Sequence, residues 1–203
     1  MNGTQYMGLA HAPSPLGPWA RANRTILPPS PAGFEANFVC NPALLQLPSG
    51  GLALVYRGGS DWGYGVCTAP AWDGDCVRPP VNAFGNDTRW LGTEDPFAFE
   101  SPRGGGYIRL SHRSWGFETF ADTYTGGGTK AISRDGLAWA WAGDYAFTYD
   151  VALTNGTTLH FQRREEPKLL LDAEGHPTHL FTVVSDLWGG GDARIIVQAL
   201  DYS

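Results

Sequence analysis

Three segments of the chain repeat one pattern, in which a polar residue stands before a proline that begins a short apolar strand. A turn that contains glycine follows the strand, and a second apolar strand returns. The three segments begin at Asn41-Pro42, at Glu94-Asp95-Pro96 and at Glu165-Glu166-Pro167. A repeat of this length indicates a repeat architecture, because each unit buries its apolar face only against the next one.

A second pattern adds two further strands to the unit. Tyr6–Trp19 resembles Gly128–Trp139, and a weaker copy runs from Tyr64 to Gly74. Each copy has a strand, a polar turn and an aromatic residue that begins the next strand. The complete unit therefore has four strands, which is the blade of a β-propeller.

We therefore expect an all-β chain in which residues 1–203 form a single, partial β-propeller domain of about three and a half blades. The expected blades cover residues 1–35, which are incomplete, and then 36–90, 91–150 and 155–203. Propellers usually have four to eight blades, so we expect the chain to be truncated at its N-terminus. A closed four-bladed form is the alternative.

The composition favours the same fold class and excludes some partners. The chain has 27 glycines, 15 prolines and only 17% charged residues, as in all-β proteins with many turns. Its net charge is −6, and no basic stripe is present, so we expect no nucleic-acid partner. No apolar run approaches a membrane span, and the N-terminus lacks the apolar segment of a signal peptide. The histidines are scattered and no phosphate-binding loop is present, so we expect no metal and no cofactor. We also expect a monomer.

Two features nevertheless indicate passage through the secretory pathway. Four of the seven asparagines stand in Asn-x-Thr glycosylation triplets, at Asn2, Asn23, Asn86 and Asn155. Cys67 and Cys76 flank a Pro/Asp/Gly turn at a spacing that suits a disulfide across a hairpin, which leaves Cys40 as a small buried side chain. We expect an extracellular or endomembrane protein. Three reduced thiols in a cytosolic protein is the alternative.

The residues before the three prolines are the first candidates for a functional site. The innermost strand of each propeller blade lines a central channel, so we expect Asn41, Asp95 and Glu165 (or Glu166) to converge on one cavity. Paired carboxylates in one cavity suit cleavage of a glycosidic bond, because one acts as an acid and another as a base or a modulator. Acidic residues before proline are also common in turns, which is the structural alternative for each of them.

Several other side chains are candidates for binding sugar. Arg57 and His112 both end the second strand of their units, so they either face the cavity and bind hydroxyl groups or are ordinary strand ends. Trp62, Trp90 and Trp115 lie near those strand ends, where they stack on sugar rings or belong to the core. The segment Ser133–Trp139 is similar to the Asp-box of sialidases but lacks one residue, and we interpret it as a turn that positions a strand.

The order of the motifs resembles the five-bladed propellers of glycoside hydrolase family 43 and its relatives, the arabinanase, xylosidase, levansucrase and invertase group. The resemblance covers residues 6 to 200. Members of that group have a catalytic-base Asp on the first blade, an Asp-Pro motif whose Asp adjusts the pKa of the acid, and a Glu-x-Pro motif whose Glu is the general acid. The resemblance implies that Asp95 is the modulator and Glu165 the acid. Glu166 is then the variable position and a substrate-binding candidate.

The catalytic base is where the sequence departs from that group. Asn41-Pro42 occupies the equivalent position on the earliest complete blade, and an amide cannot accept a proton from water. The base therefore lies on an absent N-terminal blade, or this branch has lost it. Our first hypothesis is an inverting glycoside hydrolase that acts on a plant or algal polysaccharide or oligosaccharide.

The second hypothesis is a carbohydrate-binding propeller without catalysis. A structural or protein-binding propeller is the third, and it would be supported if Asp95 and Glu165 were more than about 10 Å apart, beyond the separation expected for an inverting pair.

Overall fold

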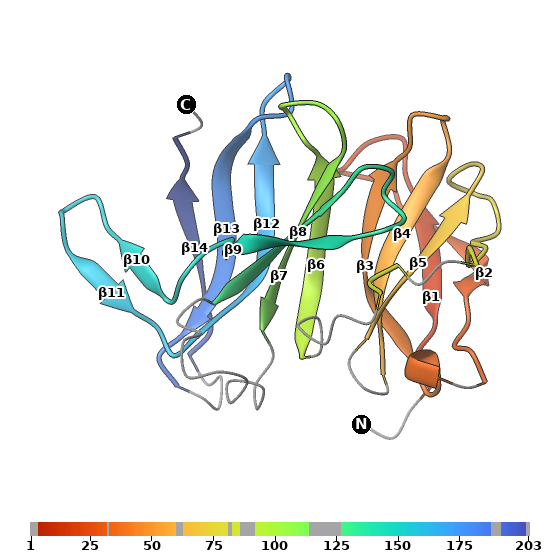
Figure 1. Ribbon diagram of the computed structural model, residues 1–203, viewed down its shortest axis with the longest axis horizontal. Coiled ribbons are helices and arrows are strands. Elements are labelled where there is room, and N and C mark those ends of the chain that lie inside the picture. Colours follow the sequence, from red (N-terminus) through yellow and green to blue (C-terminus); the bar gives the residue numbers. More distant parts are fainter. Residues whose placement is uncertain are drawn as a thin grey trace.

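A computed structural model describes residues 4–31, 33–59, 63–80, 83–85, 92–113, 127–187 and 192–201. The chain is all-β, as the sequence predicts. The strands are β1 (Met7–His11), β2 (Ala20–Leu27), β3 (Val39–Gln46), β4 (Leu52–Gly58), β5 (Tyr64–Ala69), β6 (Thr93–Glu100), β7 (Tyr107–Arg113), β8 (Gly128–Ser133), β9 (Ala140–Tyr145), β10 (Asp150–Ala152), β11 (Thr158–His160), β12 (Arg163–Leu171), β13 (Pro177–Ser185) and β14 (Arg194–Ala199). One short 3₁₀ helix, η1 (Gly33–Glu35), precedes β3 (Figure 1).

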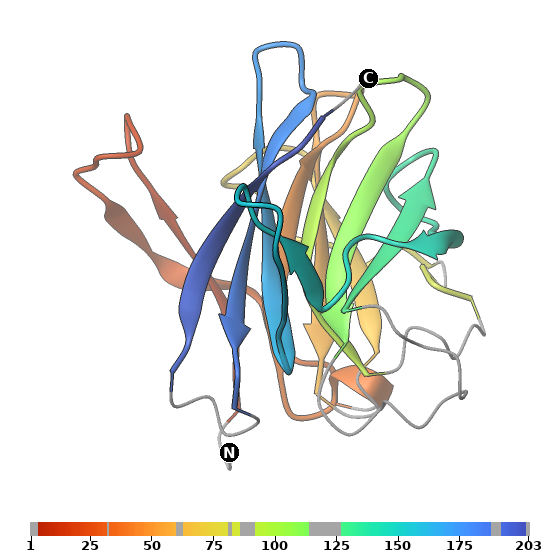
Figure 2. The same ribbon diagram turned by 90° about the vertical axis from the view of Figure 1, so that its left-hand side faces the viewer.

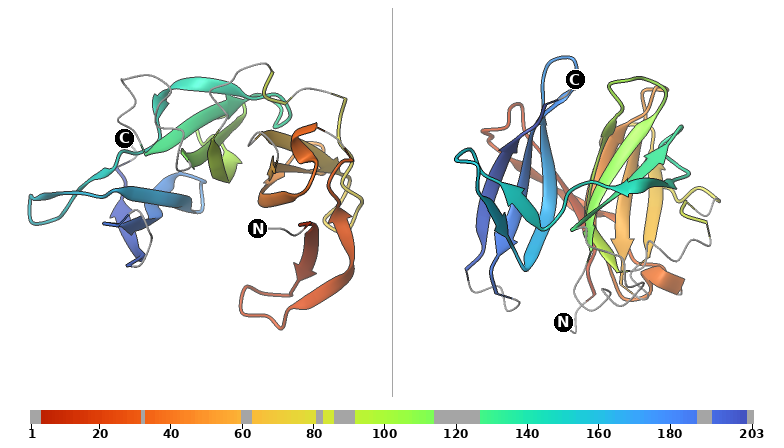
Figure 3. Two further views of the ribbon diagram at one scale, coloured as in Figure 1. Left: turned by 90° about the horizontal axis from the view of Figure 1, so that it is seen from below. Right: turned by 60° about the vertical axis from the view of Figure 1, so that its left-hand side comes forward.

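Within each sheet, strands that follow one another in the sequence pair antiparallel. The sheets are β1-β2, β3-β4-β5, β6-β7-β8-β9, β10-β11 and β12-β13-β14. They follow one another around an arc that does not close (Figure 3), and the β1-β2 hairpin projects away from the other sheets (Figure 2). Meandering sheets around a common centre are the architecture of a propeller, here an open, partial one.

The limits of the four expected blades remain a prediction. The β10-β11 hairpin, at residues 150–160, was not expected from the sequence and lies where the last two proposed blades meet. A helix long and apolar enough to cross a membrane is absent from the described ranges.

Strand β4 shows how neighbouring sheets pack together. Successive side chains of a strand point to opposite faces, and β4 is buried on both. Ala53 and Val55 belong to an apolar cluster that includes residues of β3 and of the β6-β9 sheet. Leu54 and Tyr56 point the other way, into a cluster shared with Met7 of β1. The sheet β3-β4-β5 is therefore sandwiched between its two neighbours in the arc.

A buried arginine reinforces one of these contacts between sheets. Arg109 of β7 is 0% exposed. Its guanidinium carbon lies 4.2 Å from the ring centre of Tyr64 in β5 and 4.8 Å from that of Phe84, which are cation–π distances. Burial lowers the pKa of Arg109 to about 10, so the side chain stays charged at neutral pH. The pair of sheets thus shares a charged contact as well as apolar surface.

A second buried arginine organises the last sheet. Arg164 of β12 donates to Thr182 Oγ1 on β13 at 3.1 Å and to Gln198 Oε1 on β14 at 3.0 Å. It also donates to the carbonyl of Thr148, just before β10, at 2.8 Å. Burial lowers its pKa to about 10. One side chain therefore joins all three strands of the sheet to the segment that leads into the β10-β11 hairpin.

The predicted disulfide is confirmed. Cys67 and Cys76 are bonded, with 5.4 Å between their Cα atoms, and Cys40 is free and half-buried. Asn23 and Asn155 are exposed, whereas Asn2 and Asn86 lie outside the described residues. Glycosylation and a secretory location remain predictions. The Ser133–Trp139 segment is a turn, as interpreted from the sequence, because Asp135 Oδ1 accepts the backbone N–H groups of Leu137 and Ala138.

Candidate functional site

The three proline-marked strands begin with the same local structure. Asn41, Asp95 and Glu166 each precede the proline, and each has a positive φ, of 49°, 52° and 51°. Residues other than glycine rarely adopt this conformation. A shift in strand register accompanies each one, between Cys40 and Ala43, between Glu94 and Phe97, and between Glu165 and Lys168. Such bulges redirect side chains at functional sites.

This repeated bulge shows which residues of the three proline-marked strands occupy equivalent positions. By backbone conformation, Glu166 rather than Glu165 matches Asn41 and Asp95. Glu165 instead matches Glu94, and the third member of that set is Cys40. The structure therefore has two series, one at the bulge and one just before it, where the sequence alone suggests a single series.

Members of both series meet around one histidine. His112 of β7 is 1% exposed. Its Nδ1 lies 3.3 Å from Asp95 Oδ2, and its Nε2 lies 3.5 Å from Glu94 Oε1 and 3.8 Å from Glu165 Oε1. Glu94 and Asp95 belong to β6, but Glu165 comes from β12 in another sheet. One imidazole ring spans the gap, so Asp95 Oδ2 and Glu165 Oε1 are at most about 9 Å apart, short of the separation of more than about 10 Å that would support the third hypothesis.

The third proline-marked strand also reaches this cluster. Asn41 of β3 donates a hydrogen bond from its side-chain amide to Asp95 Oδ1. Asn41 and Cys40 also line a groove of about 450 Å³ between β1 and β3, together with Tyr6 and Met7. The convergence of residues from three sheets, expected from the sequence, is therefore present in the geometry. The sugar-binding role of Asn41 remains a prediction.

Two arginines also contact carboxylates of this cluster. Arg57 of β4, which is 7% exposed, donates to Glu94 Oε2. Arg163 donates to Glu165 Oε1 at 2.7 Å from its Nε. The side chains of Asp95 and Glu165 remain 20% and 21% exposed, so both can meet a ligand. Arg57 and His112 are buried, and their predicted contact with sugar is untested.

Burial and neighbouring charge both act on Asp95. Burial raises the pKa of its carboxyl, the neighbouring His112 opposes that rise, and Glu94 and Glu166 add to it. Burial likewise raises the pKa of the Cys40 thiol, which Arg57 partly offsets. Carboxyls with perturbed pKa values in a cluster are typical of functional sites.

Solved structures with the same architecture include several hydrolases. A thermostable family-43 glycoside hydrolase aligns with 97% of this chain at a TM-score of 0.60 and 15% identity. A family-43 endo-arabinanase from Bacillus licheniformis aligns with 97% at 0.55 and 14% identity. An exo-β-1,3-galactanase from Phanerochaete chrysosporium, solved with β-1,3-galactotriose, aligns with 93% at 0.53 and 16% identity.

The chain has the fold of the family-43 glycoside hydrolases. It spans 63%, 64% and 39% of the length of those three chains. No family model matches the sequence, and no curated protein matches it. At such low identities the likeness establishes the family-43 fold and leaves the chemistry to be argued from the residues.

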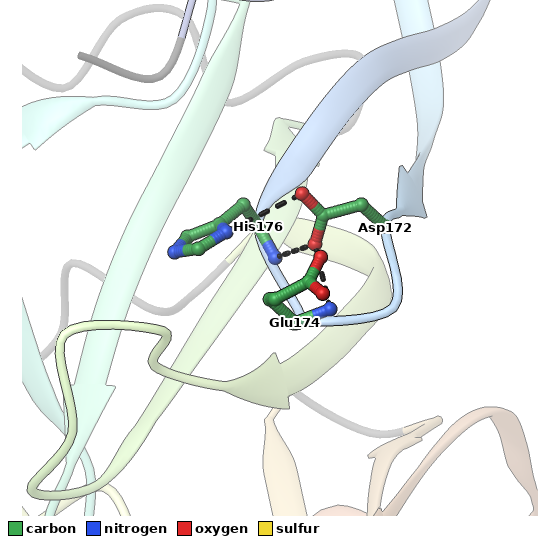
Figure 4. A group of neighbouring side chains, drawn as sticks. All are labelled: Asp172, Glu174 and His176. Atoms are coloured by element: carbon green, nitrogen blue, oxygen red, sulfur yellow. Dashed lines mark hydrogen bonds and ion pairs between the residues drawn. The ribbon is translucent and has the colours of Figure 1, made fainter.

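Sequence reasoning missed one group of potential metal ligands on this fold. Asp172, Glu174 and His176 lie on the exposed turn between β12 and β13 (Figure 4), with one ligand atom from each within 4.8 Å of the others. The Asp-x-Glu-x-His spacing around a glycine turn was the available signal.

Hydrogen bonds within the turn account for the position of its aspartate. Asp172 Oδ1 accepts the backbone N–H groups of Glu174 at 3.0 Å and His176 at 2.8 Å. The bond from His176 makes the largest contribution to lowering the pKa of Asp172. Closing the hairpin therefore explains the arrangement without an ion.

The tryptophans proposed to stack on sugar, Trp62, Trp90 and Trp115, lie outside the described residues.

Proposed function

We propose that this chain carries the acid and the modulator of an inverting glycoside hydrolase, which acts on a plant or algal polysaccharide or oligosaccharide. The single observation that carries the proposal is the meeting of Asp95 and Glu165 from two sheets around one buried imidazole. Asp95 and Glu165 contact opposite nitrogens of that ring, which brings the proposed modulator close to the proposed acid. The family-43 fold supports the same assignment.

In the proposed reaction Glu165 donates its proton to the glycosidic oxygen as the bond from that oxygen to the anomeric carbon breaks. Water attacks the anomeric carbon from the opposite face and loses a proton to a base. Asp95, when ionised, disfavours a second negative charge nearby and so helps Glu165 to keep its proton. We assign no residue of this chain as the base, because Asn41 and Cys40 occupy the β3 positions that match the acidic residues of β6.

Two observations favour a second candidate function, carbohydrate binding without catalysis. An amide stands at Asn41, where family-43 enzymes need a proton acceptor on an equivalent strand. Arg163 forms an ion pair with Glu165, so the carboxylate of the proposed acid already has a partner on its own strand. A site of this kind can still bind hydroxyl groups through its carboxylates and amide.

Hydrolysis and binding on the same substrates separate the two candidates. Because no base is assigned within this chain, the full-length protein is incubated with a panel of plant and algal polysaccharides, while reducing ends and the anomer formed first are followed by NMR. We expect release of sugar with inverted configuration, and we expect Glu165→Gln to lower the rate by about 10²–10⁴-fold, the usual contribution of a general acid. Glu174→Gln, on the exposed turn, is the matched control and should retain full activity.

The outcome also decides the alternative. Binding of a polysaccharide without any release of reducing ends would leave carbohydrate binding as the function. Release of sugar that Glu165→Gln does not slow would refute the assignment of the acid. Neither binding nor hydrolysis across the panel would refute both candidates.

A further inference from the structure

His112 lies too deep to act on a substrate directly. It lies in β7 between its strand partners Glu94 of β6 and Gly128 of β8, and only 1% of its surface is exposed. A sugar in the cavity therefore meets the carboxylates before it meets the imidazole. The role of His112 has to be found in what it does to its neighbours.

Both nitrogens of this ring face acidic side chains. Within the described ranges, every group at ion-pair distance from His112 is a carboxylate: Asp95 on the Nδ1 side, and Glu94 and Glu165 on the Nε2 side. Neither nitrogen makes a well-aligned hydrogen bond in the described part of the chain. The imidazole therefore lies between the acids as a shared neighbour rather than as the partner of one of them.

Each of the three carboxylates also has a second partner. Glu94 accepts from Arg57, Asp95 accepts from Asn41 and Glu165 accepts from Arg163. These second partners come from β4, β3 and β12. His112 contacts all three acids.

We propose that His112 is the positioning residue that sets the distance between Asp95 and Glu165. Strands β6 and β12 belong to different sheets, so no backbone hydrogen bond of a common sheet fixes the spacing of the two acids. A buried ring that touches both does so instead. This inference rests on the proposed function for its catalytic consequence, but the positioning itself can be measured without any activity.

The first test measures the pKa of Asp95 in the full chain. Asn in place of His112 keeps an N–H donor near the position of Nδ1, and Gln keeps one near Nε2, but neither carries a positive charge. The charged groups that face Asp95 are Glu94 of β6, His112 of β7, and Glu166 and Lys168 of β12. Because His112 lowers the pKa of Asp95, both H112N and H112Q should raise it. Carbon-13 NMR of aspartate-labelled protein follows the titration, and D95N identifies the signal.

The second test separates positioning from substrate contact. A displaced acid slows the chemical step but leaves ground-state binding in place, so we expect kcat to fall by about 10²-fold while KM changes little. His179→Gln on β13 is the matched control, and it should change neither kcat nor the Asp95 titration. In E165Q with His112 intact, the imidazole NMR signals of His112 should shift, which needs no His112 variant to fold.

The outcomes keep the two proposals apart. The positioning role would be overturned if the titration of Asp95 were unchanged in H112N and H112Q. It would also be overturned if the imidazole NMR signals of His112 did not shift in E165Q. A rise in KM at constant kcat would also overturn it, because His112 would then bind substrate. A shifted titration in a chain without hydrolase activity would support positioning and count against the proposed function alone.

Discussion

Asp95 carries its charge in surroundings that disfavour it. Burial raises the pKa of its carboxyl in the folded chain, and Glu94 and Glu166 add to that rise. When the folded-state pKa lies above the unfolded one, the group stabilises the folded state at low pH. That contribution is lost as the pH rises through the folded-state pKa. Asp95 therefore makes the fold less stable at neutral pH than a neutral side chain of the same shape would.

Replacing Asp95 by Asn should therefore separate stability from activity. The amide oxygen still accepts the hydrogen bond from Asn41, and the buried charge is gone. We expect D95N to unfold at a higher urea concentration than the wild type at pH 7 and at the same concentration at pH 3, while hydrolysis is lost. Urea titrations at both values measure this. A D95N chain that is the less stable one at pH 7 would contradict the account.

At the scale of single elements, the bulge before each proline stores strain. A non-glycine residue in the left-handed region costs about 1–2 kcal/mol. Asn41 and Asp95 offset part of this cost through the hydrogen bond between them. Glu166 is exposed, so removing its side chain costs the fold little packing.

Glycine at position 166 should accordingly stabilise the chain. We expect E166G to raise the free energy of unfolding by about 0.5–1 kcal/mol, because relief of strain exceeds the extra backbone entropy of glycine. Glu174→Gly is the control, at an exposed position without a positive φ, and it should lower stability by a similar amount. Chemical denaturation compares the two variants. Equal effects of both would show that position 166 carries no strain.

Sequence patterns predicted the strands better than their irregularities. Each polar residue before proline lies close to the start of a strand, which the sequence could indicate because apolar alternation and turn glycines are local signals. The repeat alone left the choice between Glu165 and Glu166 open, and only the family resemblance selected Glu165, because a bulge shifts the register by one residue and only pairing with β13 reveals the shift. The burial of His112 was equally hidden, since it depends on carboxylates from β6 and β12.

At the scale of the whole molecule, the disulfide is the covalent link between separate parts of one unit. Cys67 is 0% exposed and belongs to the cluster that β4 shares with β1 and β2. Closing a loop of this length stabilises a fold by about 2–3 kcal/mol. The double variant C67A/C76A should lower the free energy of unfolding by that amount, as measured in urea without reductant. C40A is the control, because Cys40 is free, and it should have little effect. Equal stability of the double variant and the wild type would contradict this.

The order of the sheets around the arc was foreseeable from the repeats, because each unit repeats the signals of the one before. The residues that pack against each face of a sheet could not be predicted from the sequence. Arg109 and Arg164 fill contacts between distant segments, and a lone arginine in a strand gives no sign in the sequence of the ring or carbonyl it will meet.

The meeting of Asp95 and Glu165 across two sheets has a further consequence. Each residue is held by its own strand, but no strand pairing joins β6 to β12 among the described residues. A slight opening of the arc would separate the pair while every strand kept its hydrogen bonds. Circular dichroism would then record intact strands in a protein that has lost the proposed hydrolysis. For this chain, the spacing of the sheets is as much a part of the site as the carboxylates.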